Sequence, residues 1–247
     1  MTRSNVVMVA STKGGVGKST ISIHLGRALQ LLGFNVVVVD IDEANRTACR
    51  LVKNWEAANP DVPAPLPQVI YMPGDVEAAI ESMSQTFDLV VVDAGAGAPR
   101  QNQLAIKVAD LVLVPVTPHS TDIDPTLEFL AMLKNVSLRL GRPKARVILN
   151  RLTPSRASAD EAVALFTSPN APVPAIPTWI FARESFPKMN AMGVTAFDYP
   201  RSNDLREKFT QLARSVLDVL GPGVPKPSRM PVAQRNSAGL ESNPVEG

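Results

Sequence analysis

The stretch that decides the fold is Ser11-Thr12-Lys13-Gly14-Gly15-Val16-Gly17-Lys18-Ser19-Thr20. Before it, residues 6–10 (VVMVA) form an apolar run that is typical of a buried strand. After it, apolar residues recur at helical spacing from Ile21 to Leu32 and predict a helix. A glycine-rich loop between a strand and a helix predicts an anion site, because backbone N–H groups and the positive end of the helix meet there.

The loop has the glycines and the polar side chains that phosphate binding needs. Gly14, Gly15 and Gly17 lack a Cβ, so the backbone can take positive φ angles and bring several N–H groups close to one anion. In the pattern G-x-x-x-x-G-K-[ST], the lysine, here Lys18, reaches the β- and γ-phosphates, and the hydroxyl, here that of Ser19, binds Mg²⁺. The alternative is a glycine-rich turn that binds no ligand. The nucleotide-binding residues expected in the loop are Gly14, Gly15, Val16, Gly17, Lys18, Ser19 and Thr20.

Two residues of the loop depart from that pattern. The pattern places glycine where this chain has Thr12, and it does not require the second lysine, Lys13. With Lys13, residues 13–20 (KGGVGKST) resemble the deviant Walker A motif of the ParA/MinD family of ATPases. The resemblance covers most of residues 5–220 and implies ATP and Mg²⁺ as cofactors and a homodimer that forms with ATP. It also implies that Lys13 reaches the phosphates bound by the other subunit, so that Lys13 and Lys18 both act in catalysis.

The rest of the chain alternates strands with helices. Strands are expected at residues 36–40, 69–72, 89–93, 111–115 and 146–150, with a weaker one near 176–180, and helices at 47–57, 76–84, 103–109, 124–138, 158–165 and 203–220. This order predicts an α/β fold with a doubly wound, mostly parallel sheet and helices on both faces, like the SIMIBI class of P-loop NTPases that the resemblance implies. Residues 1–220 are expected to form one domain, and the proline-rich residues 221–247 a disordered tail.

Acidic residues end two of the apolar strands. Ligands of doubly wound sheets bind at the carboxyl ends of the strands, where Asp40 and Asp93 lie. Asp93 ends a Walker B-like strand and is expected to hold a water molecule on Mg²⁺, because an unpaired buried carboxylate is costly. The alternative is an aspartate that caps a helix. The expected metal-site residues are Ser19, Asp40 and Asp93.

The sequence Asp40-Ile41-Asp42 resembles the D-x-D element of the same family. The resemblance gives Asp40 a place in the Mg²⁺ shell and gives Asp42 the catalytic role of orienting the attacking water. Phosphoryl transfer depends mostly on positioning and on charge stabilisation, so one such acid together with two lysines and Mg²⁺ is a sufficient set. The alternative for Asp42 is a solvated acidic turn.

Asn150 and Arg151 end a predicted strand and resemble the Asn-Arg pair of the family, in which the asparagine hydrogen-bonds adenine. A carboxamide donates and accepts at once, which suits the edge of that base. The alternative is an asparagine in an ordinary turn.

Composition limits the class of protein. The chain has 247 residues, is 45% hydrophobic and carries a formal net charge of +2, which is ordinary for a globular protein. Cys49 is the only cysteine, which excludes an intramolecular disulfide and argues against the iron-protein branch of the superfamily, whose dimer holds its cluster through two cysteines per subunit. His24 and His119 lack the spacing of metal ligands. No apolar run reaches the roughly 20 residues of a membrane span and none is typical of a secretory signal, so we expect a cytoplasmic protein. The family resemblance implies that it is associated with the nucleoid.

The first functional hypothesis is a ParA-type ATPase of the short form, without an N-terminal helix-turn-helix domain. The resemblance then implies non-specific DNA binding by the ATP-bound dimer, a ParB-like or cargo-adaptor protein that stimulates hydrolysis, and partition or positioning of a plasmid, chromosome or other cargo. Basic residues that suit DNA phosphates are Arg183, Lys188, Arg201, Arg206, Lys208, Arg214, Lys226, Arg229 and Arg235, although acidic residues interleave with them as on any solvated helix face. The alternatives are a MinD-like ATPase on a membrane surface and a metabolic ATP-dependent enzyme of the same fold.

Overall fold

The computed structural model describes residues 5–96, 99–118, 120–152 and 157–228. Within them, seven strands form one sheet in the order β3-β2-β4-β1-β5-β6-β7, and every pair of neighbours is parallel. The strands are β1 (Asn5–Val9), β2 (Val36–Asp40), β3 (Gln68–Tyr71), β4 (Leu89–Asp93), β5 (Leu111–Val116), β6 (Lys144–Leu152) and β7 (Ile180–Phe181). The predicted fold class is thereby confirmed.

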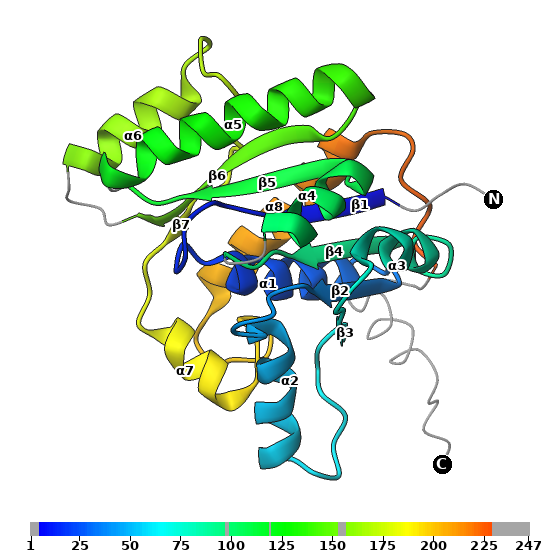
Figure 1. Ribbon diagram of the computed structural model, residues 1–247. Helices are drawn as coiled ribbons and strands as arrows, with labels where there is room; N and C mark the ends of the chain where they lie inside the picture. The colour runs from blue at the N-terminus through cyan, green and yellow to red at the C-terminus, as the bar shows by residue number, and fades with distance from the viewer. Residues whose placement is uncertain (1–4, 97–98, 119, 153–156, 229–247) are drawn as a thin grey trace, which may run out of the picture.

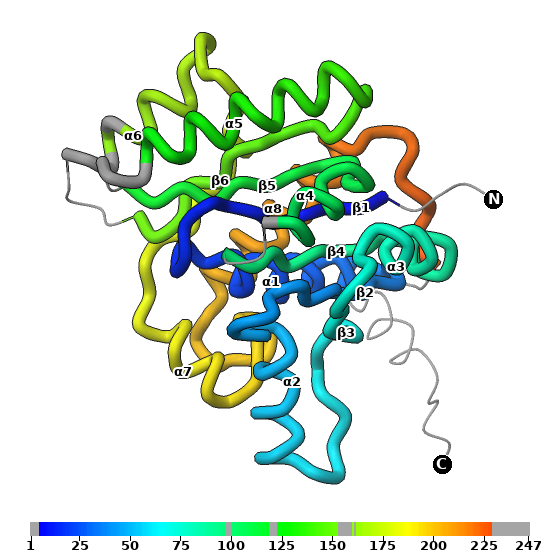
Figure 2. Tube along the Cα trace, viewed as in Figure 1, coloured from blue at the N-terminus to red at the C-terminus, as the bar shows by residue number. Residues whose placement is uncertain are grey.

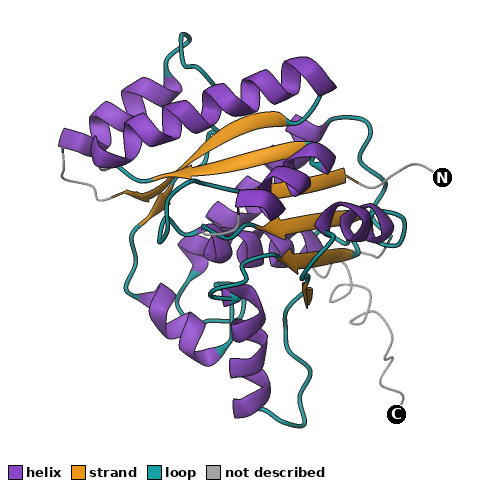
Figure 3. Ribbon diagram, viewed as in Figure 1, coloured by secondary structure: helices purple, strands orange, loops and turns teal. Residues whose placement is uncertain are grey.

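Helices cover both faces of this sheet (Figures 1 and 3). One face carries α1 (Lys18–Leu31), α2 (Thr47–Ala58), α7 (Ser185–Met192) and α8 (Asn203–Leu220), and the other carries α3 (Val76–Met83), α4 (Pro99–Val108), α5 (Ser120–Leu140) and α6 (Ala157–Thr167). Apolar residues of each group of helices pack with one face of the strands. No helix of the described residues is long and apolar enough to cross a membrane.

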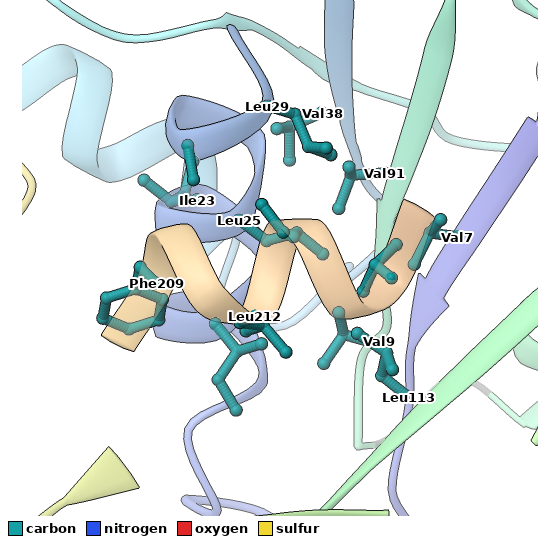
Figure 4. Packing of buried hydrophobic residues seen from close by; sticks show 14 of the residues in the cluster. Val7, Val9, Ile23, Leu25, Leu29, Val38, Val91, Leu113, Phe209 and Leu212 are labelled. Carbon is teal, nitrogen blue, oxygen red and sulfur yellow. The ribbon is translucent and has the colours of Figure 1, made fainter. Parts of the chain in front are cut away.

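Continuous apolar strands are explained by cover on both faces. In β1, Val7 and Val9 face the α1 side, whereas Val6 and Met8 face the α4 and α5 side. Figure 4 shows the apolar cluster on the α1 side of the sheet, in which Leu25 of α1 lies among the valines of the central strands. A parallel sheet with helices on both faces requires strands that are apolar at every position, because side chains alternate between two buried layers.

The register of the central strands brings the site residues to one edge. Val9, the last residue of β1, pairs with Asp93 of β4 and with Leu113 of β5, and Asp40 of β2 pairs with Asp93. Both aspartates therefore lie at the carboxyl edge of the sheet, next to the loop that follows β1. The strands β2 and β4 lie on one side of β1, and β5 and β6 lie on the other. The carboxyl end of β1 is therefore at the switch point of the sheet, where such sheets bind ligands.

Two helices begin earlier than predicted. The helix α4 starts at Pro99 rather than at residue 103, because a proline suits the first helical position, where its missing N–H has no partner to lose. The helix α5 starts at Ser120 rather than at Asp124, so Pro125 lies inside it. Proline removes one N–H donor there, but its φ angle is helical, so the helix continues through it.

The region after β6 differs most from the prediction. The helix α7 was not predicted, because it is short, contains Pro187 and buries only Met189, which leaves no apolar periodicity. The weak strand expected near residues 176–180 is the two-residue β7, and β6 is longer than predicted by two residues at each end.

The chain leaves α8 along the amino edge of the sheet, as the trace in Figure 2 shows. Residues 221–228 contain no helix or strand, and they are held by hydrogen bonds from Asn5 Nδ2 to the Gly223 carbonyl (3.2 Å) and from the Ser228 N–H to Asp88 Oδ2 (3.4 Å). Residues 229–247 of the predicted tail lie outside the described residues.

Candidate functional site

Residues 10–17 form the loop from β1 to α1. Gly15 and Gly17 take positive φ angles of 73° and 95°, whereas Gly14 is not among the positive-φ glycines. The N-cap residue of α1 is Gly17, which has no side chain to cap the helix, and the first turn holds no acidic residue. A phosphate is therefore a suitable acceptor for the N–H groups of that turn.

Lys18 begins α1 and points back into the loop. Its side chain is buried, with 7% exposed, and Nζ donates to the carbonyl of Lys13 over 2.9 Å. Burial lowers the pKa of Lys18, while the charges of Asp93 and Asp42 oppose that shift. A cation held by a loop carbonyl and facing two carboxylates is placed where the β- and γ-phosphates of a nucleotide would lie.

Asp93 is completely buried at the end of β4. Its Oδ1 accepts from the hydroxyl of Ser22 over 3.1 Å, while Oδ2 is buried without a hydrogen-bond partner among the described residues. Burial raises the pKa of Asp93 to about 7, against the hydrogen bonds of Ser19 and Ser22. The helix-cap alternative is wrong, since the next helix begins at Pro99.

The unpartnered oxygen of Asp93 fits a magnesium site. An orphaned carboxylate oxygen in the interior costs roughly 1–3 kcal/mol or more, and a metal-bound water would donate to it. The described residues contain no group of three or more His, Cys, Asp or Glu side chains that could hold a metal by themselves. Such a sparse protein shell suits Mg²⁺, which keeps several waters and binds through one or two protein groups plus substrate phosphates.

Asp40 is buried beside Asp93, and its two oxygens are both occupied. Oδ1 accepts from the N–H of Asp42 (3.0 Å) and Oδ2 from the N–H of Cys49 (3.1 Å). Burial raises the pKa of Asp40, and these two hydrogen bonds partly offset the shift. Asp40 thus holds the start of α2 and the following turn against the carboxyl edge of the sheet.

Asp42 lies in the turn after β2, where it accepts hydrogen bonds on both oxygens. Oδ1 accepts from the N–H groups of Ala44 and Asn45, and Oδ2 accepts from Asn45 Nδ2 over 3.2 Å. The side chain is only 7% exposed, so it is not the solvated turn of the alternative interpretation. Gly95 packs directly against it, because a Cβ at Gly95 would lie 2.9 Å from the Asp42 Cα.

Two adjoining cavities, each of about 280 Å³, open beside the loop. The first is the phosphate cavity, which is lined by Gly14, Gly15, Gly17, Lys18, Ser19, Thr20, Asp42, Asn45, Thr47, Ala96 and Arg151. The second is the base cavity, which is lined by Gly17, Thr20, Asn150, Arg151, Ala182, Arg183, Phe186 and Pro187. Gly17, Thr20 and Arg151 line both. A bipartite hollow, polar at one end and walled by an aromatic ring at the other, has the form that a nucleotide needs.

Asn150 lines the base cavity and also holds the loop. It lies within β6 rather than at its end, and its Nδ2 donates to the carbonyl of Val16 over 2.7 Å. A Cβ at Gly17 would lie 2.4 Å from that same nitrogen, so only glycine leaves room for this bond. One N–H of the amide is therefore engaged by the protein, and hydrogen bonding to adenine stays a prediction.

The sequence analysis missed several residues of the site, among them Ser22, Phe186 and Pro187. Ser22, which bonds Asp93, lies four residues after Lys18, so helical spacing from the lysine is a signal that could have found it. Phe186 and Pro187 belong to α7, which carries no apolar periodicity, and no sequence signal connects them to the loop.

The basic residues expected to bind DNA have different environments. The guanidinium of Arg206 is occupied, because it donates to the carbonyls of Ala196 and Tyr199. Arg183 forms an ion pair with Asp204. Lys188, Arg201, Arg214 and Lys226 are exposed, Lys208 is half-buried, and Arg229 and Arg235 lie outside the described residues, as does His119.

Comparisons with known proteins agree with this geometry. Septum site-determining protein MinD of Thermotoga maritima is 29% identical over 178 residues, which is 61% of this chain and 65% of that protein. Protein ParA of Rhizobium radiobacter is 32% identical over 149 residues, which is 58% of this chain and 63% of that protein. The chain thus matches less than two thirds of the length of these relatives.

Solved structures show the same fold. MinD of Pyrococcus horikoshii complexed with Mg-ADP superposes with a TM-score of 0.67 at 20% identity, over 89% of this chain and 98% of that one. Cobyrinic acid a,c-diamide synthase of Mycobacterium smegmatis, with a bound ATP analogue and magnesium, gives 0.63 at 19% identity, over 92% and 98%. Both structures hold the kinds of ligand, nucleotide and magnesium, that the loop and the aspartates predict here. Residues 7–196 match the family model described as the CobQ/CobB/MinD/ParA nucleotide binding domain, and the chain therefore belongs to that family.

Proposed function

We propose that this chain is a ParA-type ATPase that binds ATP with Mg²⁺, dimerises around the nucleotide, binds DNA without sequence preference and positions a cargo. The observation that carries the ATPase assignment is the buried, unpartnered Oδ2 of Asp93 beside Lys18 and the loop. Phosphoryl transfer needs mainly positioning and stabilisation of developing charge, and this edge of the sheet supplies both.

Each residue has a separate task in this proposal. The N–H groups of the loop and Lys18 bind the phosphates, while Ser19, Asp40 and Asp93 support Mg²⁺ with its waters. Bound Mg²⁺ would supply positive charge that stabilises the phosphates during transfer. Asp42, whose carboxylate is held by the N–H groups of Ala44 and Asn45, orients the attacking water.

Lys13 is the residue that links hydrolysis to dimerisation. Its backbone carbonyl accepts from Lys18, which holds the Lys13 backbone beside the phosphate cavity. In the proposed dimer, the Lys13 side chain contacts the phosphates bound by the second copy.

Two observations favour DNA over a membrane as the surface to which the protein binds. The helix α8 buries Leu205, Phe209, Leu212 and Val216 in the core, so its apolar face is already occupied by the sheet. An interfacial membrane helix needs such a face free for lipid. Lys188, Arg201 and Arg214 are exposed cations near and along this helix and suit phosphate contacts, which supply affinity without base readout.

The test is DNA binding to unrelated duplexes at a stated salt concentration, with no nucleotide, ADP, ATP or a non-hydrolysable analogue. Binding is expected only with ATP or the analogue, and Lys13→Gln should abolish it. Lys53→Gln, which changes an exposed lysine of α2, is the matched control and should bind as the wild type does. DNA binding that does not depend on the nucleotide, or no DNA binding at all, would refute the proposal.

The second candidate is a MinD-like ATPase on a membrane surface, which the similarity to MinD of Thermotoga maritima favours. Co-sedimentation with vesicles that contain anionic lipid separates the two candidates. ATP-dependent binding to vesicles and not to DNA would select the membrane role. ATP binding with neither surface bound would direct attention to the metabolic alternative.

A further inference from the structure

His24 is a buried residue of α1 whose two ring nitrogens are both engaged. Nδ1 lies 2.7 Å from the carbonyl of Thr20, and the N–H of Ala196 donates to Nε2 over 3.0 Å. Because Nε2 accepts, the ring is neutral with its proton on Nδ1, which donates to Thr20. Only 1% of the residue is exposed, and burial lowers its pKa to about 4.

The ring of His24 also forms part of an aromatic cluster. It stacks on Phe209 of α8 with 4.3 Å between centroids and meets Phe186 of α7 edge-on at 5.6 Å. Phe186 and Phe209 contact each other edge-on at 6.4 Å. Stacked and edge-to-face arrangements are the preferred contacts of aromatic rings, so the His24 ring helps to fix the position of Phe186 relative to α1.

These contacts connect the walls of the base cavity. Thr20 belongs to the first turn of α1 and lines both cavities. Phe186 belongs to α7 and lines the base cavity. His24 touches both, through a hydrogen bond on one side and a ring contact on the other. It does not line either cavity itself.

The N–H of Ala196 ties the segment between α7 and α8 to the same imidazole. The carbonyl of Ala196 accepts from Arg206 and from Ser202, so this residue is held to α8 as well. At the other end of the segment, Gly193 packs closely against α2: a Cβ at this position would lie 2.3 Å from the backbone nitrogen of Trp55. The segment that follows α7 is thus anchored at both ends. Two contacts join it to α1: the hydrogen bond to His24 and the ion pair of Arg27 with Asp198 (3.0 Å). Of the two α1 residues, His24 also contacts Phe186.

We propose that His24 is a positioning residue for nucleoside recognition: it acts through Phe186 and Ala196 to hold the base-cavity wall at a set distance from the phosphate loop. The proposal rests on the proposed function, because it takes the cavity beside Asn150 as the base site. Nucleoside contacts then depend on His24, whereas phosphate contacts, which come from the loop and Lys18, do not.

The test compares two ligands on the full chain by calorimetry: ATP with Mg²⁺, and inorganic tripolyphosphate with Mg²⁺, which lacks base and ribose. His24→Leu removes the ring and both hydrogen bonds and should weaken ATP binding about tenfold while tripolyphosphate binding changes less than about twofold. His24→Gln retains an acceptor for Ala196 without the ring. It takes the place of the leucine variant if thermal melts show that one to be unfolded, and it should shift the ratio of the two affinities in the same direction.

The matched control is Ser84→Ala, which removes the hydrogen bond of a buried serine to the Glu81 carbonyl at the end of α3, on the other face of the sheet from His24 and Phe186. It should lower the melting temperature and leave the ratio of the two affinities unchanged. Phe186→Leu combined with His24→Leu should lose no more ATP affinity than either change alone, since the two residues act as one unit.

Two results overturn the inference. One is equal loss of ATP and tripolyphosphate affinity in folded His24 variants, and the other is additive loss in the double variant. Failure of the proposed function looks different, because the wild type would then bind neither ligand.

Discussion

Replacing Asp93 with asparagine should remove a pH-dependent loss of folding stability from the ligand-free protein. Burial raises the pKa of Asp93 from its ordinary value of 3.8 to about 7. The folded state therefore binds this proton more tightly than the unfolded chain does. The stabilising contribution is complete below about pH 3.8 and is lost as the pH rises through 7. A tenfold change in an ionisation constant corresponds to about 1.4 kcal/mol, so the loss amounts to up to about 4 kcal/mol.

The assay is urea unfolding of wild type and Asp93→Asn from pH 5 to pH 8, with a chelator present and no nucleotide. The wild-type free energy of unfolding should fall relative to that of the variant by up to about 1.4 kcal/mol per pH unit across this range, because the amide does not titrate. Asp61→Asn changes an exposed carboxylate in the loop after α2 and should keep the wild-type slope.

A second arm of the same experiment adds ATP with Mg²⁺. Ligands that bind only the folded state raise its stability, so the wild type should gain stability at pH 8 and Asp93→Asn should gain far less. Equal pH slopes for wild type and Asp93→Asn would refute the reasoning, since they would mean that burial does not raise the pKa of this carboxyl group.

Three further predictions concern single positions elsewhere in the fold. Gly193→Ala should lower the free energy of unfolding by more than about 2 kcal/mol in urea titrations, because its Cβ would clash with the α2 backbone, whereas Gly141→Ala, which also has a positive φ but open space, should cost about 1 kcal/mol. Gly17→Ala should lower ATP turnover about a hundredfold in a phosphate-release assay by displacing the loop, and Gly15→Ala, with no atom near its Cβ, should lower it less. His24→Leu should make the free energy of unfolding depend less on pH in the acid range. Burial lowers the pKa of His24 from 6.5 to about 4, so the wild type loses up to about 3 kcal/mol of stability as the pH falls between these values. Urea unfolding of both proteins at pH 4.5 and pH 7 measures the difference.

Local sequence determined the fold class and the phosphate end of the site. The valine runs that end in Asp40 and Asp93 indicate buried parallel strands, and the loop at residues 11–20 indicates a phosphate site between a strand and a helix. Both signals are contained in short segments, because the apolar pattern of a strand and the backbone freedom of glycine are properties of the local sequence.

Pairing across the sheet decided what lies beside these residues. The register between β2 and β4 sets Asp40 next to Asp93, and Ser22 reaches Asp93 because α1 packs against β4. Burial raises the pKa of Asp93, and the packing of α1 and of the neighbouring strands contributes to that burial.

The base cavity was decided by tertiary structure alone. Its far wall comes from α7, a helix without apolar periodicity, and Phe186 is brought to the loop by its contacts with His24 and Phe209. His24 and Phe186 are 162 positions apart, and no local pattern predicts a contact of that separation. The phosphate end of the site can therefore be predicted from ten consecutive residues, whereas the base end forms only when the α7 and α8 segments pack against α1.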